Sequence, residues 1–524
     1  MRTFLFNIIK MKKLKLVSLA IAMACATPSF AGGLLTNTNQ HVAFNRMMSR
    51  EASIGIDGVY YNPAGVVFMG EGHHLAINWQ LAYQTRSIEN DYALFKNNVN
   101  NSITPRTFKG EAFAPVIPSF QYAYNKGRWS LQASFALTGG GGKCTFDNGL
   151  GSFEKIVAET ALAACQLAGA VDQVAAQYRV PAVFTNNDKF GKEGKYSYNS
   201  YMHGRQYYYG LSVGAAYKFS DNFSAFAGVR GVYASTNYYG YVEDIKVGNM
   251  PLYKVLDPTK ETAANIELSC DQSGVGFTPI IGVDFKTGKW NFAAKYEFKT
   301  RIRLKNKSVN QVPSIGNLPA NLRNAYIAGG VPEQAADAIL ADPTIKGAMG
   351  QLKTQFDTEL EQAIGEYEDG KKIAGDIPAY LALGVGYSPV NAVRVNVGFH
   401  WFDDKHATSY NNRQEKLKRG TLEYNAGVEV DVNKKITLST GWQNTNYGLS
   451  DEYMDDKSFV VSSNSVAVGG VYHINKKMDL NVAYFHTFYQ HKKTSENVEL
   501  TGKTYSSDYT RNNNVFAVGL DINF

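Results

Sequence analysis

The sequence predicts an all-β protein, a 14-stranded antiparallel transmembrane β-barrel with an N-terminal hatch (plug) and some helical extracellular loops. The first observation is a strict apolar–polar alternation. In the last strand Phe516, Val518, Leu520, Ile522 and Phe524 share one face. The second observation is that tight turns alternate with long connections along the chain. Alternation with a period of two places the two faces of a strand in opposite environments, which in a membrane barrel are lipid outside and water inside.

Fourteen segments carry the strand pattern. The alternation is clear at 289–304, where Trp290 and Phe292 lie on one face and mainly polar residues on the other, and it recurs at 392–404 and 418–432. An even number of strands returns both ends of the sheet to the same side of a membrane. The expected strands are 73–88, 112–124, 128–139, 200–219, 223–244, 273–286, 289–304, 375–389, 392–404, 418–432, 435–447, 460–474, 477–490 and 511–524.

The connections between these strands are alternately short and long. The short ones contain the residue types that form tight hairpin turns. They are 125–127, 220–222, 286–289, 389–391, 433–435 and 475–477. The long ones are 89–111, 140–199, 245–272, 305–374, 405–417, 448–459 and 491–510. This regularity fits periplasmic turns on one rim of a barrel and extracellular loops on the other, whereas a soluble β-sandwich gives no reason for it.

Two of the long loops also carry helical patterns. Residues 153–178, within loop 140–199, are rich in alanine with apolar residues at helical spacing. Residues 332–366, within loop 305–374, are expected to form two short helices. Such helices would either cover the mouth of the barrel or pack on its rim, and the sequence leaves both alternatives open.

The chain divides into three parts, the first of which is a signal peptide at residues 1–31. It has a basic start, the apolar run 16–24 and the cleavage site Ser29-Phe30-Ala31. The expected hatch is 32–72 and the barrel is 73–524. Five basic residues lie in the signal peptide, so 48 basic and 46 acidic residues remain, a net charge of +2. That balance offers no argument for a nucleic-acid partner.

Three cysteines remain after the signal peptide, namely Cys144, Cys165 and Cys270. An odd number in an exported protein permits at most one internal disulfide and leaves a free thiol. A Cys144–Cys165 bridge would close one long loop, but the sequence leaves the pairing open.

Prolines and glycines are expected to interrupt the sheet. Pro115 and Pro118 lie in strand 112–124 and Pro279 lies in strand 273–286. Each lacks the N–H group that a neighbouring strand needs, so we expect a bulge or a local gap there. A run of four glycines that weakens pairing ends strand 128–139, and it forms either a lateral gate in the wall or a flexible loop hinge. These glycines are Gly139, Gly140, Gly141 and Gly142.

The segment before the barrel does not alternate like the strands. It contains Asn62, Pro63, Ala64 and Gly65 in succession. Proline fixes φ and glycine permits φ > 0, so these residues predict a rigid turn in a compact hatch. An ordinary turn in a periplasmic leader is the alternative. Beside this motif, Phe68 and Met69 are candidate walls and gating residues of a ligand pocket.

These features resemble the FadL/TodX family of outer-membrane transporters for long-chain fatty acids and other hydrophobic compounds. The resemblance rests on 61–65 in the hatch, on 215–230, 376–389 and 427–442, and on the terminal aromatic Phe524. It implies a 14-stranded barrel closed by an N-terminal hatch. It also implies passive uptake of fatty acids or similar molecules, which leave through a lateral gap near the third strand. The long loops 140–199 and 305–374 depart from the family pattern and leave the ligand open.

The resemblance also implies a place in the cell and a set of partners. We expect a monomer in the Gram-negative outer membrane, among membrane lipid and lipopolysaccharide. Its ligand would be a hydrophobic, fatty acid-like small molecule. We expect no cofactor, no metal ion and no enzymatic activity, since no serine-nucleophile motif of a barrel phospholipase occurs in the sequence.

A basic stripe of four residues would face the lumen if strand 289–304 is continuous. It consists of Lys295, Lys299, Arg301 and Arg303. Such a stripe could bind the carboxylate of a ligand, or it could form internal ion pairs, which is the interpretation that we favour. The candidate partners are Glu297, Glu423, Glu429 and Asp431.

Two other functions remain as alternatives. The pair His73-His74 and the lumen-facing His400 allow a haem-binding receptor, although a single lumen histidine is usually part of a polar lining. A general porin is the other alternative. Swelling of liposomes in small sugars would favour the porin, and binding of a labelled fatty acid would favour the transporter.

Overall fold

The computed structural model describes residues 34–36, 39–186, 189–343, 345–347, 349–350, 353–354 and 365–524. The signal peptide predicted at 1–31 lies outside these residues, so it stays a prediction. Among the described residues, no helix combines the length and the apolar character needed to cross a membrane.

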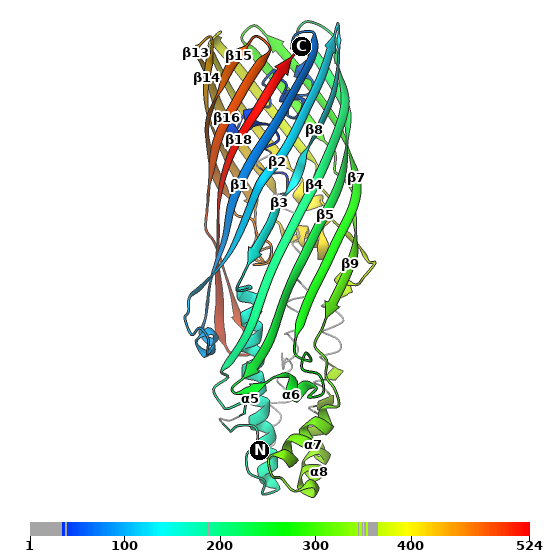
Figure 1. Ribbon diagram of the computed structural model, residues 1–524, viewed down its shortest axis with the longest axis vertical. Coiled ribbons are helices and arrows are strands. Elements are labelled where there is room, and N and C mark those ends of the chain that lie inside the picture. The colour runs from blue at the N-terminus through cyan, green and yellow to red at the C-terminus, as the bar shows by residue number, and fades with distance from the viewer. Residues whose placement is uncertain are drawn as a thin grey trace.

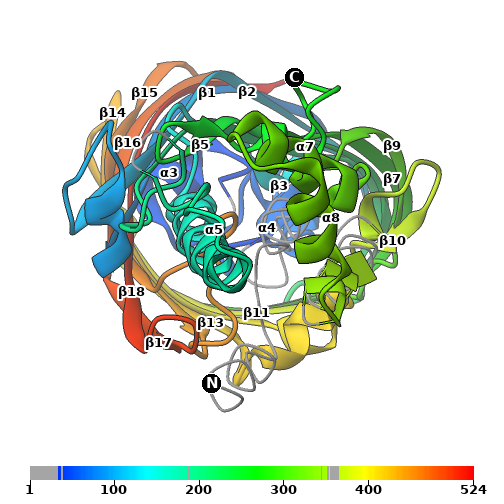
Figure 2. The same cartoon turned by 90° about the horizontal axis from the view of Figure 1, so that it is seen from below.

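The strands form one closed antiparallel sheet, in which β1 pairs with both β2 and β18 (Figures 1 and 2). The wall has 14 positions, because β9, β10 and β17 continue the strands β8, β11 and β16, and β6 is a two-residue extension. The strands are β1 (Gly72–Tyr92), β2 (Arg106–Lys126), β3 (Trp129–Phe146), β4 (Tyr196–Lys218), β5 (Phe223–Val247), β6 (Met250–Pro251), β7 (Ile266–Thr287), β8 (Trp290–Glu297), β9 (Arg303–Gln311), β10 (Lys372–Ala374), β11 (Tyr380–Val390), β12 (Val393–Phe402), β13 (Arg419–Asn433), β14 (Ile436–Gly448), β15 (Ser463–Asn475), β16 (Met478–Tyr489), β17 (Lys492–Val498) and β18 (Lys503–Asn523).

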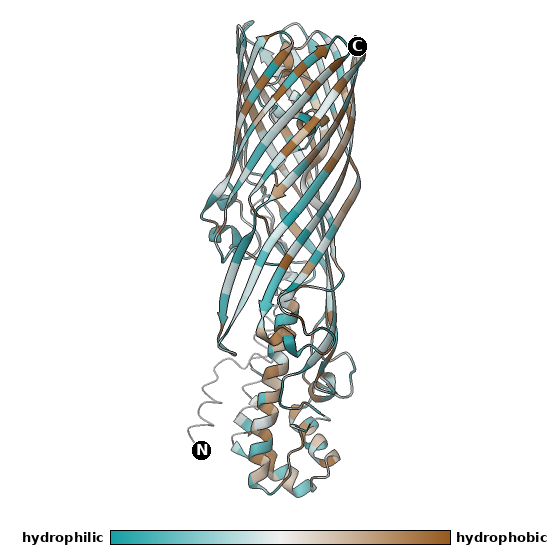
Figure 3. Cartoon of the chain, turned by 90° about the vertical axis from the view of Figure 1, so that its left-hand side faces the viewer, coloured by the Kyte–Doolittle hydropathy of each residue, from teal (hydrophilic) through white to brown (hydrophobic). Residues whose placement is uncertain are grey.

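The two faces of the sheet separate apolar from polar side chains as the alternation predicts. In β18, Phe516 is exposed on the outside, whereas Val515 and Ala517 are buried inside. Trp79, Leu131 and many other large apolar side chains are exposed around the wall, and brown residues recur along its strands in Figure 3. The backbone polar groups of the paired strands bond to neighbouring strands, as an apolar surrounding requires. The outer surface is therefore suited to lipid.

The six short turns all occur where the sequence predicts them. Each joins two antiparallel neighbours, as at Lys126 and Trp129, which are partners at the end of the β2–β3 hairpin. The turns lie at the same end of the barrel as the C-terminus, and the long connections lie at the opposite end (Figure 1). The strands extend further toward the long connections than predicted, so that β1 continues to Tyr92 and β18 begins at Lys503.

The expected strand 289–304 is not continuous, which corrects one prediction. It ends as β8 at Glu297, and β9 begins only at Arg303. The irregular residues between them shift the alternation, so that Thr300 and Ile302 become buried. The ladder between β7 and this wall position is interrupted between Ser273 and Ile280. This stretch contains Pro279, whose carbonyl oxygen accepts a 3.0 Å bond from the backbone N–H of Phe298. A one-residue change of register moves every following side chain to the other face.

The long connections build an apolar cap at one end of the barrel (Figures 1 and 2). The helix predicted at 153–178 is α5 (Gly151–Gln177), whose buried side chains form one cluster with residues of α7 (Leu318–Ala328) and α8 (Glu333–Ala341). The helix α6 (Tyr253–Leu256) and the short helix η3 (Ala93–Asn97) lie in other loops. Of the two helices predicted in 332–366, α8 is one, and much of the remainder falls outside the described residues.

The three cysteines are buried free thiols, so the described residues contain no disulfide. The sequence allowed one bridge at most and left its pairing open. Cys165 lies in α5, whereas Cys144 and Cys270 lie in β3 and β7.

A buried carboxyl in the connection between β12 and β13 makes stability depend on pH. Burial raises the pKa of Asp404 from 3.8 to about 7. Its Oδ2 accepts a bond of 2.9 Å from the backbone N–H of Thr421. Because the folded state holds this proton more tightly, stability falls as the pH rises from about 4 to about 7 and is then constant. The substitution Asp404→Asn removes this loss of stability, because asparagine has no carboxyl to ionise.

We therefore expect Asp404→Asn to be more stable than wild type at pH 8, by up to about 4 kcal/mol, and to match it near pH 4. Urea unfolding in detergent, followed by heat-modifiable gel mobility, measures the difference. Asp221→Asn is the control, because Asp221 is exposed in a short turn. An equal effect of Asp404→Asn at both pH values would contradict the prediction.

Candidate ligand pocket and lateral opening

The described part of the N-terminal segment lies inside the ring of strands (Figure 2). It contains α3 (Val42–Met47), α4 (Gly58–Tyr61) and the short helix η2 (Gly65–Phe68). Almost all residues from 40 to 67 are buried. The helix α3 packs against β13, β14, β15, β16 and β18. Residues 39–69 therefore occupy the lumen near the end that carries the short turns.

Buried ion pairs and charge-assisted bonds join this segment to the wall. Arg46 pairs with Glu429 of β13. Glu51 Oε1 lies 2.7 Å from His400 Nε2, and the other ring nitrogen of His400 lies 2.9 Å from Glu423 Oε2. Removing one partner of such a pair leaves an uncompensated buried charge, which is costly. The segment is consequently held by several specific contacts with β12 and β13.

The predicted hatch motif is anchored at the short-turn end. Asn62 Nδ2 donates to Asp284 Oδ2 at 2.6 Å, and the carbonyl oxygens of Pro63 and Ala64 accept bonds of 2.7 Å from Gln132 and Ser224. A side chain at Gly65 would overlap Asn62, so this close turn requires glycine.

The candidate pocket walls Phe68 and Met69 lie at the same end. The ring of Phe68 lies 5.3 Å from Lys286 Nζ, and Met69 packs against Val66 and Ala76. Neither residue lines the cavity described below, so their role as pocket walls stays a prediction.

The wall has a gap between β2 and β3. Ala112 pairs with Cys144 and Ser119 with Ala136, but the residues between them, 113–118 and 137–143, are not paired with each other. Pro115 and Pro118 have no N–H groups. The gap therefore leaves fewer backbone donors without a partner than it would with other residues. The carbonyl oxygen of Pro115 instead accepts a 3.0 Å bond from the indole N–H of Trp79. The gap is therefore where the prolines predict it.

The four predicted gate glycines form one edge of this gap. Gly139 and Gly142 keep their register partners in β4, although the β3–β4 register shifts twice along this stretch. Neither glycine has a register partner in β2. Gly140 has φ of +104° and Gly142 has φ of +71°, values that favour glycine. Gly141 lies between them in β3. The structure thus brings all four glycines to the unpaired part of the wall, whereas their role as a gate stays a prediction.

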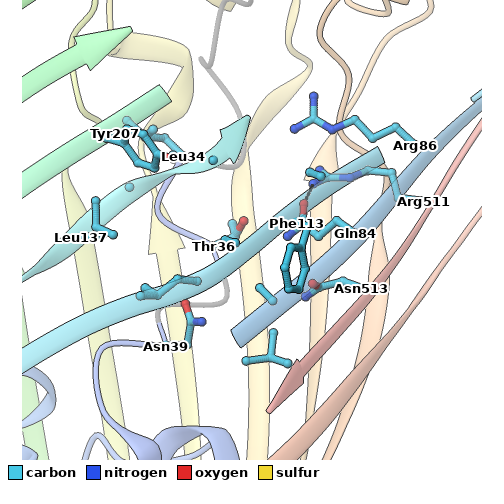
Figure 4. Close-up of a pocket in the computed structure, with 18 of the residues that line it drawn as sticks. Leu34, Thr36, Asn39, Gln84, Arg86, Phe113, Leu137, Tyr207, Arg511 and Asn513 are labelled. Carbon is cyan, nitrogen blue, oxygen red and sulfur yellow. Dashed lines mark hydrogen bonds between the residues drawn. The ribbon is translucent and has the colours of Figure 1, made fainter. Parts of the chain in front are cut away.

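A cavity of about 250 Å³ opens at the gap (Figure 4). Its lining includes inward-facing residues of β1 and β18, such as Arg86 and Val515, and residues of the gap itself. Among the latter, Phe113 is 59% exposed and Val116 is 61% exposed. A cavity that is lined by both faces of the sheet at an unpaired stretch extends from the lumen into the wall.

The N-terminal segment contacts the cavity and one edge of the gap. Leu34, Thr36 and Asn39 line the cavity, and Gln40 Nε2 donates to the carbonyl oxygen of Leu137 at 2.7 Å. A side chain on Gly139 would lie 3.0 Å from Leu34 Cδ1. The segment inside the barrel and the opening in its wall are therefore in direct contact.

The sequence did not identify the polar end of this cavity. Arg86 and Arg511 are partners across β1 and β18, and both line the cavity. They lie on the inward faces of strands that were predicted at 73–88 and 511–524. The phase of the alternation places each of them in the lumen, but only the pairing of the first and last strands brings them together.

The predicted basic stripe does not form as one surface. Lys295 is buried, and its Nζ lies 2.9 Å from Glu297 Oε1 and 2.7 Å from the carbonyl oxygen of Tyr60. Lys299 and Arg303 pair with Asp376 at 3.7 and 2.9 Å. Arg301 is exposed because the irregular residues after β8 reverse the alternation. Lys295 therefore forms the internal ion pair that we favoured, and the other three residues do not continue its line.

The histidines that suggested a haem receptor lie on different faces of the wall and have partners of their own. His73 is exposed on the outer face, with its ring 4.6 Å from that of Tyr124. His74 is buried on the opposite face, where both ring nitrogens have partners, Asn523 and the carbonyl oxygen of Gly70. Both ring nitrogens of His400 also have partners. No group of three metal-binding side chains lies together in this part of the chain.

No protein-family model matches the chain. No curated protein matches it in sequence either. Solved structures do match its fold. A FadL homologue of Pseudomonas aeruginosa has a TM-score of 0.57 and 14% identity, and the match covers 94% of this chain and 100% of that one.

Two structures of TodX also match. The Pseudomonas putida toluene transporter TodX has a TM-score of 0.50 and 14% identity, with coverage of 94% of this chain and 100% of that chain. The deltaS2 mutant of the TodX monoaromatic hydrocarbon channel has a TM-score of 0.52 and 13% identity, with coverage of 93% and 100%. The protein described here therefore has the β-barrel fold of the FadL/TodX type.

Proposed function

We propose that the protein is an outer-membrane channel for the passive uptake of long-chain fatty acids or similar hydrophobic small molecules. The observation that carries the proposal is the gap between β2 and β3, which opens on a cavity in contact with the N-terminal segment. The fold is shared with a FadL homologue and with a toluene transporter, which supports a channel for hydrophobic compounds.

The route has three steps. The apolar loop cluster around α5 captures the ligand, the cavity receives it, and the gap releases it sideways into the membrane. Each buried CH₂ group contributes about 0.8 kcal/mol, so an acyl chain favours an apolar path over a water-filled pore. With lateral release, the acyl chain does not have to leave through the polar N-terminal segment at the short-turn end. The N-terminal segment, 32–72, is the proposed hatch.

A general porin is a weaker alternative, because residues 40–67 are mostly buried within the ring of strands. The exposed apolar belt of the wall supports contact with membrane lipid and lipopolysaccharide. We propose a monomer, since the closed sheet needs no second chain to complete it.

Uptake by whole cells tests the proposal. A Gram-negative host that lacks its own fatty-acid channel should take up radiolabelled oleate at least several-fold faster when it makes this protein. Proteoliposomes that contain the purified protein should not swell in small sugars. Swelling without oleate uptake would identify a porin and contradict the proposal. Mass spectrometry of apolar molecules that co-purify with the protein would identify the natural ligand.

A further inference from the structure

A group of basic side chains projects from the outside of the barrel at β9 and β10. Leu304 of β9 and Ile373 of β10 are buried in one apolar cluster with Leu34 of the N-terminal segment, so they face the lumen. Successive residues of a strand point to opposite faces, and their neighbours therefore face outward. We call the five exposed basic residues here the outer basic cluster. They are Arg301, Arg303, Lys305, Lys307 and Lys372.

The sheet brings these charges close together. Lys305 and Lys372 are register partners, and Figure 2 shows β9 and β10 side by side in the wall. Register partners in an antiparallel ladder lie about 5 Å apart, and residues two apart on one strand lie about 7 Å apart. Like charges that face each other across a ladder are destabilising. An anion that contacts several members of the cluster would offset this repulsion.

Acidic side chains neutralise only part of this charge. Asp376 pairs with Arg303 at 2.9 Å and with Lys299 at 3.7 Å. Asp271 is the register partner of Lys307, and its Oδ1 accepts a bond of 2.9 Å from Asn237 Nδ2. The other four members of the cluster have no ion pair with a described residue. The cluster therefore keeps a positive charge that faces outward.

The outer basic cluster begins where the lipid-facing part of its strand should end. At the short-turn end, the ring of Trp290 lies 4.3 Å from that of Tyr387, as in the aromatic girdle of a membrane barrel. A tilted strand crosses a bilayer in about 9–11 residues. Counted from Trp290, this wall position reaches the far side of the membrane near Thr300, next to Arg301. With the short turns in the periplasm, that side is the outer leaflet.

An apolar surface adjoins the cluster on its membrane side. Phe277 is 69% exposed and Val275 is 65% exposed on the outer face of β7. Ser273 of β7 is the register partner of Lys305, so both apolar residues lie nearer to the short turns than that lysine. Acyl chains on this surface and phosphate groups at the cluster would match one amphiphile whose charge lies at the level of the lipid head groups.

We infer that the outer basic cluster is a binding site for the diphosphorylated lipid A part of lipopolysaccharide. Its guanidinium and ammonium groups hold the phosphates through charge-assisted hydrogen bonds, and the acyl chains lie on the outer face of β7. The site is local, because the outward residues Glu89 and Asp91 near the same end of β1 are acidic. The inference goes beyond a general contact of the apolar belt with lipid, and it does not depend on the molecule that the channel transports.

Binding of matched lipids to protein refolded in dodecyl maltoside tests the site. By thermophoresis, wild type should bind diphosphoryl lipid A at least about 10-fold more tightly than the dephosphorylated lipid. A fourfold variant should weaken binding of diphosphoryl lipid A about 10-fold and change binding of the dephosphorylated lipid less than about 2-fold. It combines Arg301→Gln, Lys305→Gln, Lys307→Gln and Lys372→Gln. Arg303 is retained because it pairs with the buried Asp376.

Two further variants serve as controls. The first removes four positive charges from exposed residues at the short-turn end, and it combines Lys126→Gln, Arg128→Gln, Lys434→Gln and Lys435→Gln. It should bind diphosphoryl lipid A like wild type. The second keeps the charge of the cluster, with Lys305→Arg, Lys307→Arg and Lys372→Arg, and should also retain binding.

Several outcomes would overturn the site. They are equal binding of the phosphorylated and dephosphorylated lipids to wild type, and an equal loss of binding in the fourfold variant and its short-turn control. Phosphatidylglycerol bound as tightly as lipid A, or lipid A displaced by millimolar inorganic phosphate, would overturn the assignment to lipopolysaccharide. If the fourfold variant lacks heat-modifiable gel mobility, Lys307→Gln with Lys372→Gln replaces it, and unchanged binding would then count against the site. Oleate uptake is measured separately, so a failure of this site is distinguishable from a failure of the channel.

Discussion

Oxidation of a variant that carries Ala114→Cys and Gly142→Cys is expected to abolish oleate uptake, and a reductant is expected to restore it. A Cβ atom at residue 142 would lie 3.9 Å from the Cβ of Ala114, across the gap between β2 and β3. That separation suits a disulfide, which needs about 3.5–4.5 Å between Cβ atoms. The bridge would tie the two unpaired edges together, and a ligand that leaves through the wall would lose its exit.

The design needs controls for the native thiols and for the backbone. The buried Cys144, Cys165 and Cys270 are replaced by alanine in all variants, so that only the new pair can react. Gly142 has φ of +71°, and a cysteine there costs about 1–2 kcal/mol, which the single variant Gly142→Cys measures separately.

A second disulfide tests whether position matters. Val397→Cys and Ala426→Cys place a bridge between β12 and β13, where the two residues are already register partners. This bridge should leave uptake near the level of its parent protein. Unchanged uptake after complete cross-linking of the gap pair would refute lateral release.

The second large effect is expected from Gly441→Val, which adds one side chain in the lumen. Gly441 of β14 lies directly against the backbone of α3, and an added Cβ would overlap the carbonyl oxygen of Met47. Backbone cannot move aside as the end of a flexible side chain can. Gly441→Val should therefore displace α3 from the wall and break the neighbouring contact between Arg46 and Glu429. We expect proteoliposomes with this variant to swell in small sugars several-fold faster than those with wild type.

The matched control is Gly231→Val, which adds the same side chain to β5. There the nearest atoms would lie 3.7 and 3.9 Å away, which is ordinary contact. This variant should keep the low permeability of wild type. If Gly441→Val stays impermeable and its N-terminal segment stays resistant to protease, the segment does not act as a plug.

The architecture of the barrel was largely predictable from local sequence. Alternation along each strand and the six tight turns are short-range signals, so the wall, its 14 positions and the inner and outer faces could be read from residues such as Val515 and Phe516. The gap at Pro115 and Pro118 was also predictable, because a missing N–H is a property of the residue itself.

The ligand site was less predictable, for two physical reasons. In the sequence the alternation continues through Phe298, Thr300 and Ile302. The structure interrupts it between β8 and β9, and the predicted basic stripe is lost there. Arg86 and Arg511 lie 425 positions apart in the chain, and only closure of the sheet makes them neighbours. The depth of the segment in the lumen, which placed Phe68 and Met69 away from the cavity, depends on contacts between distant residues.

The pairing of β1 with β18 also bears on how the barrel is assembled. The N-terminal segment precedes every strand in the chain, yet α3 packs on β13 to β16, which lie far along the sequence. The surface on which α3 packs does not exist until those strands have formed. Likewise, Arg86 and Arg511 are not neighbours until β18 pairs with β1. The lumen contacts of this segment can therefore form only late in assembly, after the C-terminal strands have paired.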